Sequence, residues 1–371
     1  MLVEDIGSIS ATSEVDYLPG QQNAHVRVVA VQEDRMSGSL TLDNPARQFG
    51  DAAVLTLGQQ FSSAFTAGDL LRFELSATEY FGEGDRSLFG AVAYRMPIGG
   101  NGSYGEFYFG NVLADRDATG TLERTDIEGN TAILAFGHPV IRDVARYGYA
   151  LFELRQSSSE VVLPTVGFDA DVDVLSASWI YGAALSQGGA WEYAVNLSYG
   201  RSVTDVGGTR SEDEDFWHLR AGVGYQRPVG WLGENSSFHA ELWGQYTSDA
   251  LPAIEEFYLG GIDDERGYSL AEVQGDIGVS ATFELGRDFY PKGQTLQRVR
   301  PFGFLDAGYV KNNDPASNEL SEETFASLGL GVDLEFKGNV FLRNYVAVPL
   351  TDGPDTSSGD PAFYLSLTKT W

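Results

Sequence analysis

The chain has 371 residues, including 44 Gly, 22 Phe and 18 Tyr, so it is rich in turn formers and strand formers and has enough apolar surface to fold. A formal net charge of −29 argues against a nucleic-acid partner, because phosphate binding requires a concentrated basic surface. The absence of cysteine excludes disulfides, thiolate metal sites and a cysteine nucleophile.

The first 34 residues stand apart from the rest. The opening MLVEDIGSISATSEV has neither a basic region nor an apolar stretch, so it does not read as a signal peptide. This segment ends in the strand-like AHVRVVAVQ, and we expect residues 1–34 to be the remnant of a preceding domain, followed by one barrel domain over 35–371.

Two-faced strands dominate the remainder of the chain. No stretch reaches the ~18 to 20 apolar residues of a membrane-spanning helix, so a chain that crosses a bilayer must do so as a closed barrel. Between residues 191 and 199, large apolar side chains alternate with small or polar ones, and the stretches 217–225, 276–285 and 325–336 repeat the pattern. Such alternation is typical of strands with one apolar and one polar face.

Counting these segments predicts an all-β fold, a sixteen-stranded antiparallel transmembrane barrel. Soluble sandwiches also alternate, but their strands are typically about five or six residues long, whereas several of these reach nine or more. Aromatic residues at strand ends, such as Trp191 and Trp217, favour the membrane barrel. The predicted strands are 36–43, 51–62, 68–80, 85–96, 103–113, 130–140, 145–157, 172–185, 190–201, 213–226, 236–247, 271–287, 299–310, 324–336, 339–349 and 362–371.

The end of the chain carries a pattern typical of outer-membrane barrels, which commonly finish in an aromatic residue on an alternating strand. Lys369 interrupts this pattern, but its charged head could snorkel into the headgroup region. The residues of the pattern are Phe363, Leu365, Leu367 and Trp371.

A long loop is expected between the strands 236–247 and 271–287, and it contains the segment FYLGGIDDERGY. Asp306 falls on the polar face of the predicted strand 299–310, the second strand after this loop, and a carboxylate inside a barrel is costly unless it is paired. Arg266, next to the permissive Gly267, could fold back into the lumen and present its guanidinium fork to Asp306.

These motifs resemble those of the TpsB transporters of two-partner secretion (the ShlB/FhaC/HecB type), a superfamily that also holds the BamA-type assembly proteins. In that family a Gly-Gly turn precedes a V-R-G-F/Y tetrad on the sixth loop, and an F-x-D-x-G motif follows on the thirteenth strand. Glu265 departs from the usual Val of the tetrad. The resemblance implies an inward-folded sixth loop anchored by an Arg-Asp contact, with Gly260, Gly261, Arg266, Gly267 and Tyr268 opposite Phe304, Asp306 and Gly308.

A second likeness lies near the start of the barrel, where the family has an L-D-N turn, a Gly and then a G-D before the third strand. In this light the segment LPGQQNAHVRVVAV looks like the end of a periplasmic POTRA domain. Both features favour TpsB over the assembly-type barrels. The residues of the barrel likeness are Leu42, Asp43, Asn44, Gly50, Gly68 and Asp69.

No enzyme site, cofactor site or metal site is predicted. His218 and His239 fall on inner faces, where a hydrogen-bonded lumen histidine is the expected role, and His25 and His138 are scattered. The acidic run 212–215 lacks the ligand spacing of a calcium loop, so we expect a solvated extracellular loop.

The resemblance implies a monomeric transporter in the outer membrane of a Gram-negative bacterium. Its cargo would be an unfolded, β-helical exoprotein of the haemolysin or adhesin type, passed from periplasm to cell surface. Other expected partners are outer-membrane lipid, lipopolysaccharide and, during biogenesis, the barrel-assembly machinery. Two alternatives stay open: a BamA-type barrel that inserts other proteins, and a passive porin-like channel.

Overall fold

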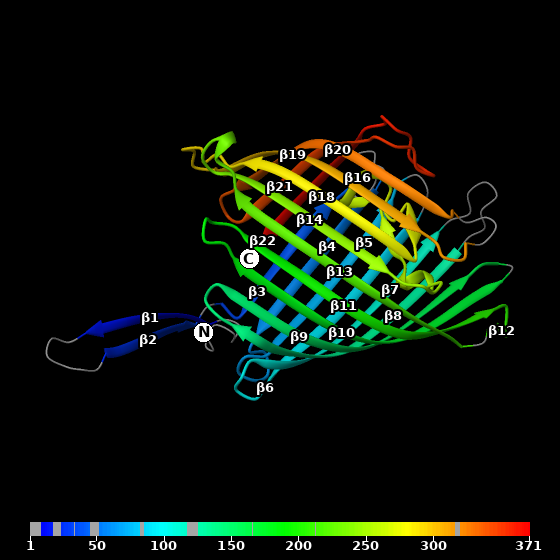
Figure 1. Ribbon diagram of the computed structural model, residues 1–371, viewed down its shortest axis with the longest axis horizontal. Coiled ribbons are helices and arrows are strands. Elements are labelled where there is room, and N and C mark those ends of the chain that lie inside the picture. Colours follow the sequence, from blue (N-terminus) through cyan, green and yellow to red (C-terminus); the bar gives the residue numbers. More distant parts are fainter. Residues whose placement is uncertain are drawn as a thin grey trace.

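Sixteen long strands pair antiparallel into one closed barrel (Figure 1) in the part of the chain that the computed structural model describes, as the sequence predicted. The described residues are 9–17, 24–32, 34–44, 52–81, 85–116, 125–164, 166–211, 213–315 and 320–371, with the backbone alone for 9–17 and 24–32. Gly50, Glu212 and the side chain of His25 lie outside them. The barrel strands are β3 (Met36–Asp43), β4 (Ala52–Ser62), β5 (Leu70–Tyr80), β6 (Arg86–Ile98), β7 (Ser103–Arg116), β8 (Thr125–Arg142), β9 (Arg146–Val162), β10 (Gly167–Ala184), β11 (Ala190–Val206), β13 (Glu214–Pro228), β14 (Ser236–Tyr246), β18 (Ile277–Arg287), β19 (Leu296–Lys311), β20 (Glu322–Phe336), β21 (Val340–Pro349) and β22 (Ala362–Thr370).

The first and last barrel strands close the wall. β22 pairs with β3 from Ser366 opposite Asp43 to Thr370 opposite Ser39. Beyond this ladder, Gly38 and Trp371 exchange two backbone hydrogen bonds of 3.0 Å. Closure leaves no free sheet edge at this seam, as a bilayer requires.

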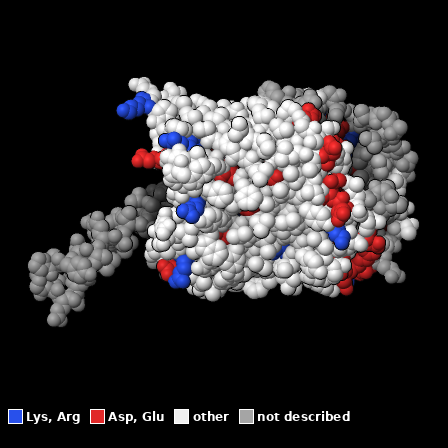
Figure 2. Space-filling model, turned by 45° about the horizontal axis from the view of Figure 1, so that its top comes forward, with Lys and Arg blue, Asp and Glu red and all other residues white. Residues whose placement is uncertain are grey.

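Alternation along the strands places apolar side chains outside and polar or small ones inside. On β20, Leu328 and Leu330 are exposed on the outer surface, whereas Ser327 between β19 and β21 is fully buried. Figure 2 shows the result: a broad band with few charged atoms covers the wall, acidic side chains gather at its right-hand edge and basic ones mainly at its left-hand edge. This is the surface expected of a barrel set in lipid.

The strands β8 to β11 are longer than the sequence predicted, with 18, 17, 18 and 17 residues. Their added length lies at the end away from the termini, where β11 continues into the two-residue β12 (Thr209–Arg210) (Figure 1). The outward positions there are mostly polar, for example Asp169 and Asp171, so alternation of apolar side chains does not mark them.

The predicted strand 271–287 is two elements. Val273–Gly275 (β17) pairs with Phe257–Leu259 (β15) inside the long loop, and the barrel strand β18 begins at Ile277. The other small elements are the 3-10 turns η1 (Gly230–Leu232) and η2 (Ala253–Glu255), the loop strand β16 (Gly261–Tyr268), and a separate two-stranded sheet of β1 (Ile9–Tyr17) and β2 (Ala24–Gln32). None of the helices in the described ranges is long and apolar enough to span a membrane.

Candidate functional site

The loop between β14 and β18 enters the barrel and packs on its inner wall. Its strand β16 contacts β18, β19, β20, β21 and β22 through their inward-facing side chains. Arg266 and Tyr268 of β16 are both buried as a result. A loop of this kind occupies space that would otherwise be open lumen.

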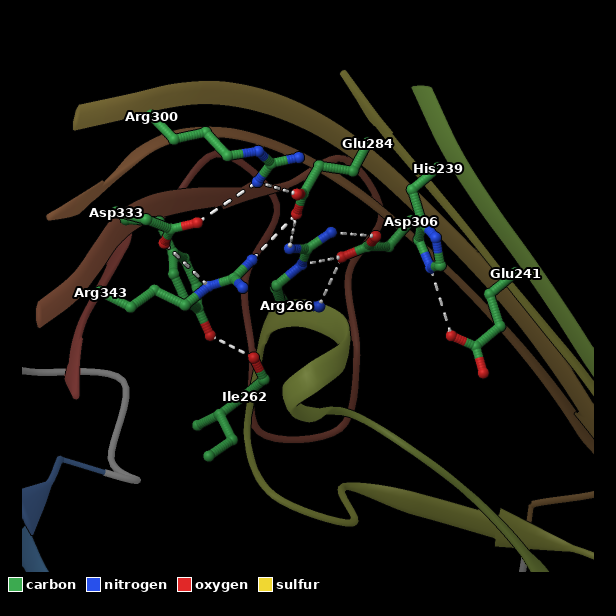
Figure 3. Close-up of polar contacts among 10 residues, drawn as sticks. His239, Glu241, Ile262, Arg266, Glu284, Arg300, Asp306, Asp333 and Arg343 are labelled. Atoms are coloured by element: carbon green, nitrogen blue, oxygen red, sulfur yellow. Dashed lines mark hydrogen bonds and ion pairs between the residues drawn. The ribbon is translucent and has the colours of Figure 1, made fainter. Parts of the chain in front are cut away.

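Arg266 forms the centre of this contact (Figure 3). Its Nε and Nη2 donate to the two carboxylate oxygens of Asp306 at 2.7 and 2.8 Å, and its backbone N–H donates to Oδ2 at 3.1 Å. Its Nη1 donates to Glu284 at 3.3 Å. The guanidinium also lies over the ring of Phe304, 3.5 Å from the centroid. The planar fork of arginine suits both the bidentate pairing and the stacking.

Glu284 connects this pair to a larger ionic network. It accepts hydrogen bonds from Arg300 at 2.7 Å and from Arg343 at 2.9 Å, and both arginines also lie within 4 Å of Asp333 (Figure 3). With Arg266 and Asp306, the network holds three arginines and three carboxylates. The matched charges reduce the cost of placing so many ions on one half-buried wall.

Tyr268 and Gly267 fix the path of the chain beyond Arg266. The ring of Tyr268 stacks on Phe325 with centroids 3.9 Å apart, and its hydroxyl donates to the carbonyl oxygen of Ala326 at 2.8 Å. Gly267 has φ of +109°, which strains any other residue, and a Cβ there would meet Pro349 at 3.3 Å. Gly260 has φ of +98° at the other end of β16.

Glu265 is the residue at which the tetrad departs from the family pattern, and it is fully buried with φ of +41°. Oε1 accepts a hydrogen bond from Ser280 at 2.7 Å, and Oε2 has no hydrogen-bond partner among the described residues. A Cβ at Gly308 would stand 2.4 Å from Oε1, so the absence of a side chain there makes room for the carboxyl group. Burial raises the pKa of Glu265 to about 8, with further contributions from nearby Asp264 and Asp306.

The other residues singled out from the sequence lie elsewhere. The C-terminal residues Phe363, Leu365, Leu367 and Trp371 share the outward face of the wall. His138 bonds Ser103 at 2.8 Å and His239 lies 3.6 Å from Glu241. Within the described ranges no group of three or more His, Cys, Asp or Glu is arranged to hold a metal ion.

Three functional features were not identified from the sequence. Alternation in the stretches 276–285 and 325–336 places Glu284 and Asp333 on inner faces, but it does not identify their arginine partners. From the sequence, Glu265 is only a departure from the motif. Glu255, which is fully buried on the turn η2, carries no periodicity that could have marked it.

A family model described as haemolysin secretion/activation protein ShlB/FhaC/HecB matches residues 22–334. Comparison with curated proteins gave no match.

Similar solved structures cover 100% of this chain. CdiB from Escherichia coli has a TM-score of 0.80 and 16% identity over 69% of its own chain, and CdiB from Acinetobacter baumannii has 0.78 and 15% over 67%. BamA from Haemophilus ducreyi lacking POTRA domains 1–3 has a TM-score of 0.64 and 13% identity over 76% of its chain. At these identities the likeness concerns the fold.

Proposed function

The chain belongs to the ShlB/FhaC/HecB family of haemolysin secretion/activation proteins, the two-partner secretion transporters of the Gram-negative outer membrane, and on that premise we propose that it exports an unfolded, β-helical exoprotein of the haemolysin or adhesin type. Residues 1–34 are, in this proposal, the end of a periplasmic POTRA domain. The outward-facing C-terminal pattern that ends in Trp371 serves as the signal read by the barrel-assembly machinery.

A polar interior supports this role. The inner faces of β3, β4, β5 and β8 carry hydroxyl side chains, such as Ser39, Thr56, Ser76 and Thr131. An extended polypeptide has unpaired backbone N–H and C=O groups, which water and such hydroxyls can satisfy. A cargo could therefore pass without first forming secondary structure.

The observation that carries the proposal is the anchoring of the interior loop by Arg266 and Asp306. A loop that fills part of the lumen must move before a polypeptide can pass. The ionic contact between Arg266 and Asp306 stabilises the closed arrangement. Displacement of the loop from the wall opens the lumen to the cargo. Folding of the exoprotein outside the cell then favours outward movement.

Export can be tested in cells that express the full-length transporter with a β-helical exoprotein encoded beside it. We expect the exoprotein in the culture medium, and faster export with Arg266→Ala, because the closed arrangement then loses the ionic contact that stabilises it. Arg86→Ala is the matched control, because Arg86 is an exposed arginine paired with Asp115 on the outer wall.

Two results would contradict the proposal. Retention of the exoprotein in the periplasm with the unaltered transporter would exclude export of this cargo. Loss of other outer-membrane proteins on depletion of the transporter, with export unchanged, would favour an assembly role.

A further inference from the structure

The interior loop has a second ionic contact, made by Glu255 on the turn η2. Its carboxylate accepts a hydrogen bond from Arg155 of β9 at 2.5 Å and one from Nε2 of His218 of β13 at 3.1 Å. Nη2 of Arg220, also on β13, lies 3.9 Å from the same carboxylate. The side chain of Glu255 is fully buried by these contacts.

The backbone at Glu255 is held as well. Its carbonyl oxygen accepts hydrogen bonds from Nη2 of Arg220 at 2.8 Å and from Nε2 of Gln245 at 3.0 Å. Gln245 also donates to the carbonyl of Asp276, at the point where the loop rejoins the barrel. Both the side chain and the main chain of this turn are therefore fixed to the wall.

The carboxylate at this position is ionised at neutral pH. Burial alone would raise the pKa of Glu255, but the hydrogen bond from His218 and the positive charges of Arg155 and Arg220 hold it below the usual value. A buried carboxylate with three cationic or hydrogen-bonding partners loses much more on separation than an exposed ion pair does.

The contacts of Glu255 share no residue with those described for Arg266. The side chain of Glu255 binds β9 and β13 and its carbonyl oxygen also binds β14, whereas the side chain of Arg266 binds β18 and β19. The loop is thus attached at two separate parts of the inner wall. Release at one of them leaves the loop attached at the other.

We propose that Glu255 is a positioning residue that holds the loop independently of Arg266, so that the pore opens only when both contacts are released. This inference rests on the proposed role of the loop as the gate of the pore. If so, two variants that each remove a different contact should change the ratio of open to closed pores by the product of their separate fold-changes. Two variants within the same contact should change it no more than one of them does.

The test is single-channel recording of the full-length protein in planar lipid bilayers, without any cargo. We expect Glu255→Gln and Arg266→Ala each to raise the ratio of open to closed time by at least about tenfold, and the double variant by about the product of the two. Arg155→Met should raise the ratio alone or with Arg266→Ala, but should add nothing to Glu255→Gln.

Asp263→Asn is the matched control, because it removes the same single charge from an exposed position of the same loop. Heat-resistant migration of each variant in gels shows that the barrel has formed, and Arg155→Met probes the contact from the wall if Glu255→Gln does not fold. An open-to-closed ratio that neither Glu255→Gln nor Arg155→Met changes, alone or with Arg266→Ala, would overturn the inference. Because no cargo is present, this result is independent of whether the protein exports an exoprotein.

Discussion

At the scale of single residues, Arg266 combines a bidentate ion pair with Asp306 and a stacked contact with Phe304. Arg266→Lys keeps the positive charge but loses both the fork and the planar stacking. We expect the backbone amides of 261–268 to exchange hydrogen for deuterium faster by about tenfold, corresponding to about 1.4 kcal/mol. Mass spectrometry of peptides from this segment gives the measurement, with Arg86→Lys as the control. Unchanged exchange would show that charge alone holds the loop.

Glu265 makes the stability of the closed loop dependent on pH. The buried carboxyl, with a pKa of about 8, binds its proton more tightly than it would in a released loop, where the ordinary value is 4.5. The closed loop is therefore fully stabilised below pH 4.5 and becomes less stable as the pH rises to about 8. The acidic side chains of Asp264 on β16 and Asp306 on β19 add to this effect, whereas Ser280 on β18 opposes it.

We expect opening of the loop to increase between pH 5 and pH 8 in the unaltered protein, measured as hydrogen exchange in 261–268 after division by the intrinsic amide exchange rate at each pH. Glu265→Val places the residue usual in the family at this position, and Glu265→Gln keeps the size of the side chain without its charge. Both variants should lose the pH dependence. A pH dependence that persists in both would place the titrating group elsewhere.

At the scale of the strand, each residue is assigned to lipid or lumen by its position in the alternation. Leu57 of β4 faces outward and Thr56 faces inward, where it bonds Ser76 at 3.0 Å. Leu57→Lys should lower the free energy of unfolding in lipid by about 2 to 4 kcal/mol, while Thr56→Lys, whose ammonium reaches water, should cost under about 1 kcal/mol. Urea titration of the folded barrel compares the two variants, and equal losses would contradict the assignment of faces.

The strands were predictable because lipid outside and water inside require apolar and polar residues to alternate along each strand. On β20 every outward residue from Leu328 to Leu334 is apolar, and the structure has the predicted pairing. This alternation ends where the strand leaves the lipid. The predicted start of β10 is therefore residue 172, whereas the strand begins at Gly167. Hydrogen bonding of the backbone continues there without an apolar face.

The candidate site was predictable only in part. Asp306 could be placed on the inner face by alternation, and the motif around Arg266 supplied its partner. Glu255 and Glu265 lie in a loop whose path depends on contacts with many strands at once, and no periodic pattern encodes such a path. Their burial follows from the folded barrel and not from their neighbours in the sequence.

At the scale of the whole molecule, the barrel and its interior loop are separable. β14 pairs directly with β18 from Ser236 opposite Arg287 to Gln245 opposite Gly278, so the loop between them is not needed to close the wall. Replacing residues 252–274 by a short glycine-serine turn should leave a folded barrel with several-fold higher conductance in planar bilayers. A replaced protein that folds but conducts no better than the unaltered one would show that the loop does not limit the pore.

The unequal strand lengths give the pore an oblique outer mouth. β8 has 18 residues and β4 has 11, and the added residues of β8 to β11 lie at the end away from the termini (Figure 1). At about 3.3 Å per residue and a tilt of about 40°, the roughly 5 residues that each of these strands adds at that end raise it by roughly 13 Å. A polypeptide that leaves the pore passes the longer strands β8 to β11 on one side and shorter strands such as β4 on the other. Its first contact with the cell exterior is therefore asymmetric.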